Sequence, residues 1–218
     1  MNKVIFDWNK YINLSRAAGA EGIVMLENRD NVLPLDNDKS IAVFGRAQLN
    51  YYKCGMGSGG MVNVSKVYNI LDGLRERTDI KINEELLKIY EEWVEANPFN
   101  EGEGWGTEPW SQIEMEIDEE TVNNAAKVSD VAMVIIGRTA GEDKDFTDSK
   151  EAFRLSDIEE DMMTKVRKAF KKVIVLLNIG SLTNMDFIDT YNPDAVMIVW
   201  QGGMVGGLGT ADVISGKV

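Results

Sequence analysis

The segment from residue 131 to residue 148 constrains the fold more than any other part of the sequence. It opens with an unbroken apolar run rich in valine and isoleucine, residues 131–136, which ends at Gly137. A strand with one face in water would alternate apolar and polar residues, so this run predicts a strand buried on both faces at the centre of a sheet. Acidic residues follow at once, and ligands of open α/β sheets bind beyond the carboxyl ends of the strands. This acidic segment is therefore a candidate site.

Other apolar runs predict further strands, and helices are expected between them. Buried strands are expected at residues 41–44, 173–177 and 195–200, and shorter extended segments at 22–26, 32–35 and 80–82, with a turn at 28–31. Helices are expected at residues 7–20, 65–76, 83–96, 118–127, 156–170 and 184–190, and a glycine-rich turn at 201–209 leads into a last helix that ends near Ser215. Ser65, Asn83, Asp118 and Ser156 are the expected capping residues, the last with Glu159 in a capping box.

Strands that alternate with helices favour a mostly parallel sheet covered on both faces. We therefore expect one domain, residues 1–218, with α/β architecture: a three-layer α/β/α sandwich. Loops that begin at Gly45, Gly137, Asn178 and Gln201 follow strand ends and should gather at one edge of the sheet.

Composition removes several classes of function. The chain has no histidine and one cysteine, Cys54, which excludes a histidine-based catalytic triad, a histidine-ligated zinc site and an internal disulfide. A net charge of -13 repels phosphate backbones and anionic lipids, so neither nucleic acid nor a membrane is an expected partner. No apolar run approaches the ~20 residues of a spanning helix, and the start lacks the apolar region of a signal peptide. A cytoplasmic location is expected, and homo-oligomerisation is left open.

Two irregular segments carry the remaining signals. Residues 55–60 read GMGSGG and satisfy a dinucleotide-binding pattern, but about ten residues separate them from the preceding strand, so no nucleotide cofactor is expected. The segment is either a flexible surface loop or a backbone that approaches a neutral polar ligand. Residues 98–112 include Trp105 and Trp110 and cannot be regular structure. This loop either packs on its own domain or has a function or a docking role.

The acidic segment has three interpretations: a solvated surface, a metal loop or a catalytic site. Lys144 stands among its carboxylates and the spacing of an EF-hand is missing, so no metal site is expected. Because the chain lacks histidine, its carboxylates, lysines and tyrosines are the groups left for proton transfer. These residues alone do not decide between a solvated surface and a catalytic site.

Several segments together resemble a known family. The stretches EGIVMLENRDNVLPL, SIAVFGR, GMGSGG, VIIGRTAGEDKD, VIVLLNIGS and VWQGGMVGGLGTADVISGK occur in this order. They resemble the α/β-sandwich domain of glycoside hydrolase family 3, above all its β-glucosidases, from about Ser15 to Lys217. The resemblance implies an active site shared with a TIM-like barrel, which supplies an aspartate nucleophile, and no cofactor. The whole protein would be a retaining β-glucosidase that acts on short β-glucosides such as cello-oligosaccharides, with this chain inactive alone.

Matching motifs carry roles to particular residues. Glu142, in the Gly-Glu pair of the acidic segment, is implied to be the acid/base, with Asp148 and Glu151 as weaker candidates. Ser58 is implied to contact the sugar, with Gly57 and Gly59 lining the pocket. Residues 143–146 depart from the family's usual Gly-aromatic-Asp-Arg. The expected domain order places this sandwich before the barrel, and a noncatalytic α/β carbohydrate-binding or structural module is the alternative function.

Overall fold

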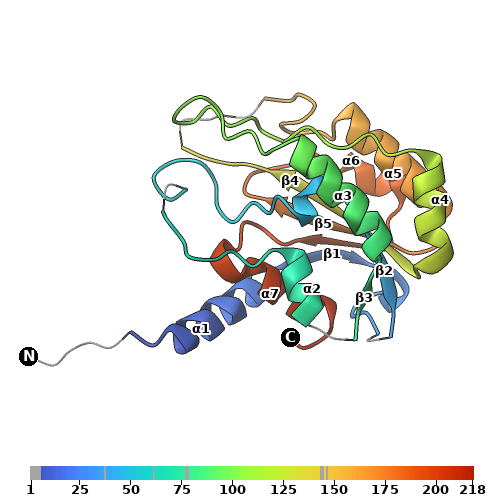
Figure 1. Cartoon of the computed structure of the whole chain (residues 1–218), viewed down its shortest axis with the longest axis horizontal. Helices are drawn as coiled ribbons and strands as arrows, with labels where there is room; N and C mark the ends of the chain where they lie inside the picture. The colour runs from blue at the N-terminus through green and yellow to red at the C-terminus, as the bar shows by residue number, and fades with distance from the viewer. Residues whose placement is uncertain (1–5, 37, 61, 77–78, 143–144, 146) are drawn as a thin grey trace, which may run out of the picture.

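The computed structural model describes residues 6–36, 38–60, 62–76, 79–142, 145 and 147–218. Six strands form one sheet in the order β1-β6-β5-β4-β2-β3 (Figure 1). The strands are β1 Val24–Asn28, β2 Ser40–Phe44, β3 Lys81–Ile82, β4 Val131–Arg138, β5 Val173–Ile179 and β6 Ala195–Ile198. Neighbouring strands are parallel except at one edge, where β1 runs antiparallel to β6. The expected mostly parallel sheet is confirmed.

Helices cover both faces of this sheet. They are α1 Trp8–Glu21, α2 Ile70–Glu76, α3 Glu84–Ala96, α4 Glu119–Val128, α5 Asp157–Ala169, α6 Asp186–Tyr191 and α7 Gly206–Ile214. Short 3-10 turns stand at η1 Arg29–Asn31, η2 Arg46–Gln48 and η3 Gly203–Val205. Helices α3 to α6 pack on one face, while α2 and α7 pack on the other (Figure 1). Helix α1 packs on α7. The three-layer α/β/α sandwich is therefore confirmed.

Strand β4 lies inside the sheet, between β5 and β2. Alternate side chains of this strand, such as Ala132 and Val134, belong to the apolar cluster under α4 and α5. Their neighbours, such as Met133 and Ile135, belong to the cluster under α2 and α7. Burying one large aliphatic side chain stabilises a fold by about 1.5–3 kcal/mol, so a strand that is apolar on both faces is driven to this position. The expectation of a central, doubly buried strand is confirmed.

Capping residues start three helices where the sequence places them. The side chains of Asn83 and Asp118 accept hydrogen bonds from the backbone N–H groups of Leu86 and Thr121. Ser156 and Glu159 form the full capping box of α5. Each cap satisfies a backbone donor that has no partner inside the helix, which contributes about 1 kcal/mol.

Three local expectations are wrong. Residues 32–35 form no strand, because the Asn28 side chain binds both the N–H and the carbonyl of Leu33 and so replaces a strand partner. Ser65 does not begin a helix. Helix α2 begins at Ile70, where Asn69 and Asp72 exchange hydrogen bonds between side chain and backbone N–H.

The third wrong expectation is the glycine-rich turn at residues 201–209. Helix α7 already begins at Gly206, and strand β6 ends at Ile198 rather than at residue 200. A Cβ atom on Gly207 would lie 2.0 Å from the carbonyl oxygen of Asn69, and one on Gly73 would lie 2.2 Å from that of Gly207. These glycines let α2 and α7 approach each other closely, which a turn-like composition does not reveal. No helix of the described residues is both long and apolar enough to cross a membrane.

Candidate functional site

Loops at the carboxyl ends of the parallel strands meet on one edge of the molecule, at the left of Figure 1. We call residues 46–60 the glycine loop, residues 98–112 the tryptophan loop and residues 139–155 the acidic loop. The glycine loop follows β2 and the acidic loop follows β4. The tryptophan loop follows α3, and the backbone N–H of Thr139 donates to the carbonyl of Trp110 within it. The expected gathering of loops on one edge is confirmed.

The glycine loop lies directly against the start of the acidic loop. Met56 forms a parallel bridge with Gly141, and its N–H donates to the carbonyl of Ala140 at 2.6 Å. A Cβ atom on Gly55 would lie 2.2 Å from that carbonyl oxygen, and one on Gly141 would lie 2.6 Å from the Met56 Cβ. The two backbones approach this closely only because both positions are glycine.

This contact brings Ser58 and Glu142 together. The Oε2 atom of Glu142 lies 3.5 Å from the backbone nitrogen of Ser58, a long hydrogen bond, and both residues are exposed. Gly57 has a φ of 100°, and a Cβ atom there would lie 2.8 Å from the same carboxylate oxygen. Gly59 borders open space. Three of the four residues singled out near this loop therefore form one cluster at the surface, and Gly59 faces outward.

The two alternative carboxylates have other surroundings. Asp148 accepts two hydrogen bonds from the Arg154 guanidinium, at 2.6 and 2.8 Å, which hold its pKa below the usual value. Glu151 lies in a tight turn with a φ of 74°, and its N–H donates to the carbonyl of Arg154. Asp143, Lys144 and Phe146 lie outside the described residues. Asp148 is thus an ionised salt-bridge partner at the turn that precedes α5.

A buried ion pair supports the base of the acidic loop. Arg138, the last residue of β4, donates to both carboxylate oxygens of Glu159 at 2.8 and 2.6 Å, and both side chains are buried. Its guanidinium also donates to the carbonyl of Arg154. The Gln201 side chain donates to the Arg138 carbonyl from the loop after β6. The loop that carries Glu142 is therefore fixed at its root from two sides.

Asn178, in strand β5, ties two loops together beneath the site. Its side-chain oxygen accepts from the N–H of Tyr52, and its Nδ2 donates to the carbonyls of Tyr52 and Trp200. The neighbouring Tyr51 hydroxyl accepts from the N–H of Gly202, and burial raises the pKa of Tyr51 to about 12. Burial also raises the pKa of Tyr52, so both tyrosines stay neutral and fix the start of the glycine loop over the sheet.

One buried arginine fixes the tryptophan loop. The guanidinium of Arg46 donates to the carbonyl of Asn97 at 2.9 Å and to that of Ile113 at 2.6 Å, which lie at the two ends of this loop. The same guanidinium lies 5.0 Å from the ring centre of Trp93. Glu114 accepts from the Arg46 N–H, and burial raises the pKa of Glu114 to about 7.

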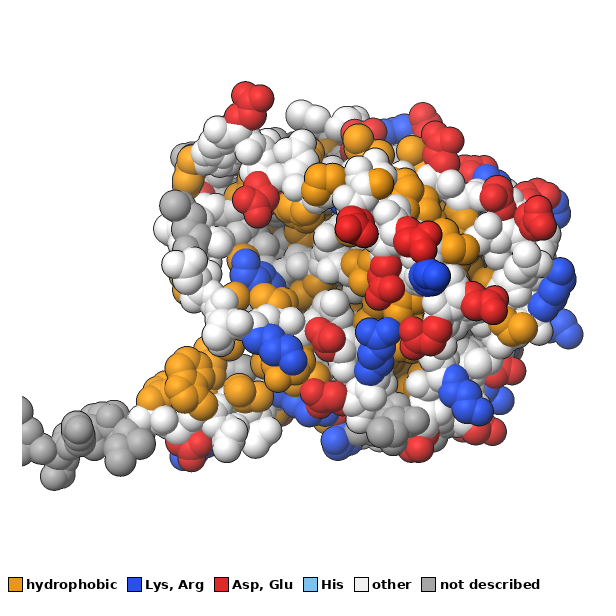
Figure 2. Space-filling view, viewed as in Figure 1, with side chains coloured by type: hydrophobic (Ala, Val, Ile, Leu, Met, Phe, Trp, Pro, Cys, Tyr) orange, Lys and Arg blue, Asp and Glu red, His pale blue; other side chains and the backbone are white. Residues whose placement is uncertain are grey.

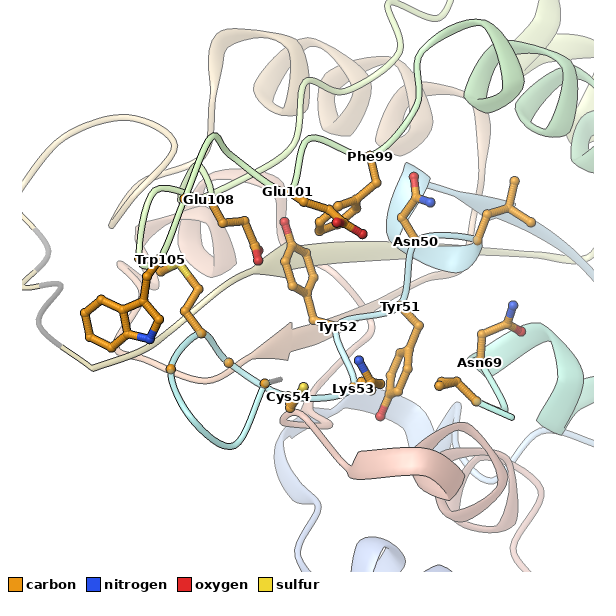
Figure 3. A pocket seen from close by; sticks show the side chains of 18 residues that line it. Asn50, Tyr51, Tyr52, Lys53, Cys54, Asn69, Phe99, Glu101, Trp105 and Glu108 are labelled. Atoms are coloured by element: carbon orange, nitrogen blue, oxygen red, sulfur yellow. The ribbon is translucent and has the colours of Figure 1, made fainter. Parts of the chain in front are cut away.

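The glycine and tryptophan loops, together with Val67 and Asn69, line an open cavity of about 680 Å³ (Figure 3). Tyr51 and Tyr52 form part of its wall from one loop, and Phe99 and Trp105 from the other. A hollow is visible at this edge of the molecule in the space-filling view (Figure 2). A cavity of this size falls in the range of ~300–1,000 Å³ that is typical of small-molecule sites.

Comparison with known proteins identifies the domain. The sequence model of the glycosyl hydrolase family 3 C-terminal domain family matches residues 23–218 of this chain. This chain belongs to glycosyl hydrolase family 3. The resemblance expected from the sequence motifs is therefore confirmed. Its relatives by sequence include a β-glucosidase of Ruminococcus albus, 52% identical over 212 residues that cover 97% of this chain and 22% of the relative.

Solved structures agree with the family assignment. A β-glucosidase from Paenibacillus barengoltzii is 45% identical, has a TM-score of 0.94, and is matched over 99% of this chain and 24% of its own. β-Glucosidase 3B from Thermotoga neapolitana, solved in complex with α-D-glucose, is 34% identical with a TM-score of 0.86, over 97% of this chain and 30% of its own. The family 3 domain described here thus spans about a quarter of the length of these proteins.

Sequence reasoning missed the residues that support this family 3 site. Asn178 is expected from the sequence only as the start of a loop at this edge, and its place as a polar interruption at the end of the apolar run of β5 is a signal that could have identified its supporting role. Arg46 and Glu114 have no such signal. Charged residues are mostly exposed, so the sequence predicts that both lie at the surface, whereas the fold buries them. Within the described part of the chain, no three carboxylate or cysteine side chains are grouped as metal ligands.

Proposed function

We propose that this family 3 domain is the sandwich half of a retaining β-glucosidase and that Glu142 is its acid/base. The observation that carries the proposal is the contact of the Glu142 carboxylate with the Ser58 and Gly57 backbone, at the loop edge of the sheet. The curated and solved relatives named above are β-glucosidases, which supports the same reaction class. Short β-glucosides such as cello-oligosaccharides are the proposed substrates.

A retaining mechanism needs two carboxyl groups about 5–5.5 Å apart. One attacks the anomeric carbon, while the other protonates the leaving oxygen and later takes a proton from water. We assign the second role to Glu142, which is exposed at the rim and stands on a loop fixed by Arg138 and Gln201. The nucleophile would come from a barrel domain of the full-length protein. Asp148 is less suited to donate a proton, because Arg154 stabilises its ionised form.

Leaving-group dependence in the full-length enzyme tests the acid/base role. In the Glu142→Ala variant, glucosides with poor leaving groups should lose on the order of 10²–10⁴-fold in rate, the usual contribution of general acid catalysis. Dinitrophenyl glucoside should lose much less in its first step, since its leaving group departs without a proton. Azide should restore turnover and give β-glucosyl azide, because azide attacks without a base.

Matched variants separate Glu142 from the other acids of the loop. Asp148→Ala and Glu151→Ala should keep the wild-type dependence on the leaving group. The assignment fails if one of these variants, rather than Glu142→Ala, shows the azide rescue. A full-length protein that hydrolyses no β-glucoside at all would instead favour a noncatalytic carbohydrate-binding module.

A further inference from the structure

The side chain of Gln201 lies between the roots of three other loops. Its Nε2 donates to the carbonyl of Arg138, the last residue of β4, at 3.2 Å. Its Oε1 lies against two glycines, because a Cβ atom would be 2.4 Å from this oxygen on Gly180 and 3.2 Å from it on Gly55. Gly180 follows β5, and Gly55 belongs to the glycine loop. The amide thus occupies a slot that exists because neither residue has a side chain.

The residue before Gln201 has a strained backbone. Trp200 has a φ of 54°, a left-handed value that is uncommon for a bulky side chain. Its carbonyl accepts from Asn178 Nδ2 at 2.7 Å, and its indole Nε1 donates to the carbonyl of Gly22 at 2.8 Å. Strained residues of this kind persist where the surrounding contacts hold them, and they cluster at functional sites. The fold therefore fixes the point from which the Gln201 side chain enters its slot.

This slot adjoins the contact that holds the glycine loop against the acidic loop. A Cβ atom on Gly180 would lie 2.9 Å from the Ala140 Cβ, and the Ala140 carbonyl accepts from the N–H of Met56 at 2.6 Å. Glu142 follows two residues later, and its carboxylate lies 3.5 Å from the backbone nitrogen of Ser58. A shift at the root of the acidic loop would consequently move this carboxylate relative to the glycine loop.

We propose that Gln201 is a positioning residue for the acid/base, which holds the root of the acidic loop so that Glu142 meets the glycosidic oxygen in the correct direction. The inference rests on the proposed function and adds a residue to it. Gln201 acts through Arg138 and touches no substrate. Proton transfer needs the two heavy atoms within about 2.6–3.2 Å of each other, so a displaced carboxylate lowers the rate of proton donation.

The test uses two substrates of the full-length enzyme that differ in their need for a proton. Gln201→Met keeps the length of the side chain and removes its hydrogen bond to Arg138. In this variant, kcat/KM for phenyl glucoside, a poor leaving group, should fall about tenfold, because a misplacement of ~1 Å can cost up to ~10²-fold in rate. For dinitrophenyl glucoside, kcat/KM should change less than about twofold, since its leaving group departs without a proton. Gly180→Ala should give the same pattern, because the new Cβ would displace the Gln201 amide.

The matched control is Ser181→Ala, because Ser181 follows Gly180 directly and its hydroxyl has no hydrogen-bond partner among the described residues. It should leave kcat/KM unchanged for both substrates, and thermal unfolding should show that the variants are folded. If Gly180→Ala fails to fold, Gln201→Met decides alone. An equal loss on both substrates in Gln201→Met, or no loss on either, would overturn the positioning role while the proposed function stands. If Glu142→Ala itself shows no dependence on the leaving group, the proposed function fails instead.

Discussion

At the scale of single residues, Glu114 shows how burial alters a carboxylate. It is 6% exposed, and its two oxygens accept from the N–H groups of Arg46 and Met115. Burial raises its pKa from 4.5 to about 7, although these hydrogen bonds and the charge of Arg46 lower it. Because the folded state holds this proton more tightly than the unfolded state, the contribution of Glu114 to stability is complete below pH 4.5 and is lost as the pH rises through 7.

We therefore expect Glu114→Gln to remove one pH-dependent part of the stability. Relative to this variant, the wild-type domain should lose on the order of 1–3 kcal/mol of unfolding free energy between pH 5 and pH 8. Urea unfolding at several pH values measures the difference. The exposed Glu116→Gln serves as the control and should run parallel to the wild type. If the free energy of unfolding differs between Glu114→Gln and the wild type by the same amount at every pH, the raised pKa of Glu114 is contradicted.

At the scale of elements, the tryptophan loop depends on one side chain of a different segment. Arg46 stands in η2 after β2, yet it binds carbonyls at both ends of residues 98–112. An interaction of this kind replaces the strand or helix ladder that an irregular loop lacks. Removal of the guanidinium would leave these two carbonyls without a hydrogen-bond donor, which costs about 1–3 kcal/mol of stability for each group.

Arg46→Met should therefore loosen this loop while keeping a long side chain beside Trp93. We expect a loss of roughly 2–5 kcal/mol in stability, as for other broken buried charge networks, and faster proteolytic cleavage within residues 98–112. Arg75→Met is the matched control, because Arg75 pairs with Glu84 at the surface, where an ion pair contributes less than ~1 kcal/mol. Similar cleavage rates in both variants would argue against the anchoring role of Arg46.

The sequence predicts an element correctly when nearby residues determine it, and it fails when a contact from elsewhere in the fold determines it. The β4 run and the caps at Asn83 and Asp118 are local signals, so their predictions are confirmed. Residues 32–35 have a local pattern that a contact from Asn28 overrides. The anchoring by Arg46 needs the tertiary fold, which no local pattern encodes. For the site, the family resemblance implied separate roles for Ser58 and Glu142, and the structure brings the two residues together. The cavity arises from two loops about 50 residues apart in the chain.

At the scale of the whole molecule, the two faces of the sheet each bury an apolar cluster. One cluster joins the sheet to α3 to α6, and the other joins it to α2 and α7. A domain of about 200 residues with cores on both faces buries enough surface to fold cooperatively. Glu142 nevertheless stays at the surface, and under the proposed function a barrel domain of the full-length protein supplies the second carboxyl group.

The 218-residue chain alone should accordingly unfold in one cooperative transition and yet show no activity on an aryl β-glucoside above background. Circular dichroism on heating tests the first part, with a midpoint that EDTA leaves unchanged. A nitrophenyl glucoside assay of the same sample tests the second. Measurable turnover by the pure chain would show that it contains its own nucleophile.

The anchoring of the tryptophan loop at both ends has a consequence for how such a domain can diverge. Because Arg46 fixes the two ends beside each other, the chain between Asn97 and Ile113 can change length without any shift of the sheet. Doubling the length of a loop costs only about 0.6 kcal/mol of closure entropy. We therefore expect that this loop can be exchanged between homologous domains while the sheet keeps its structure.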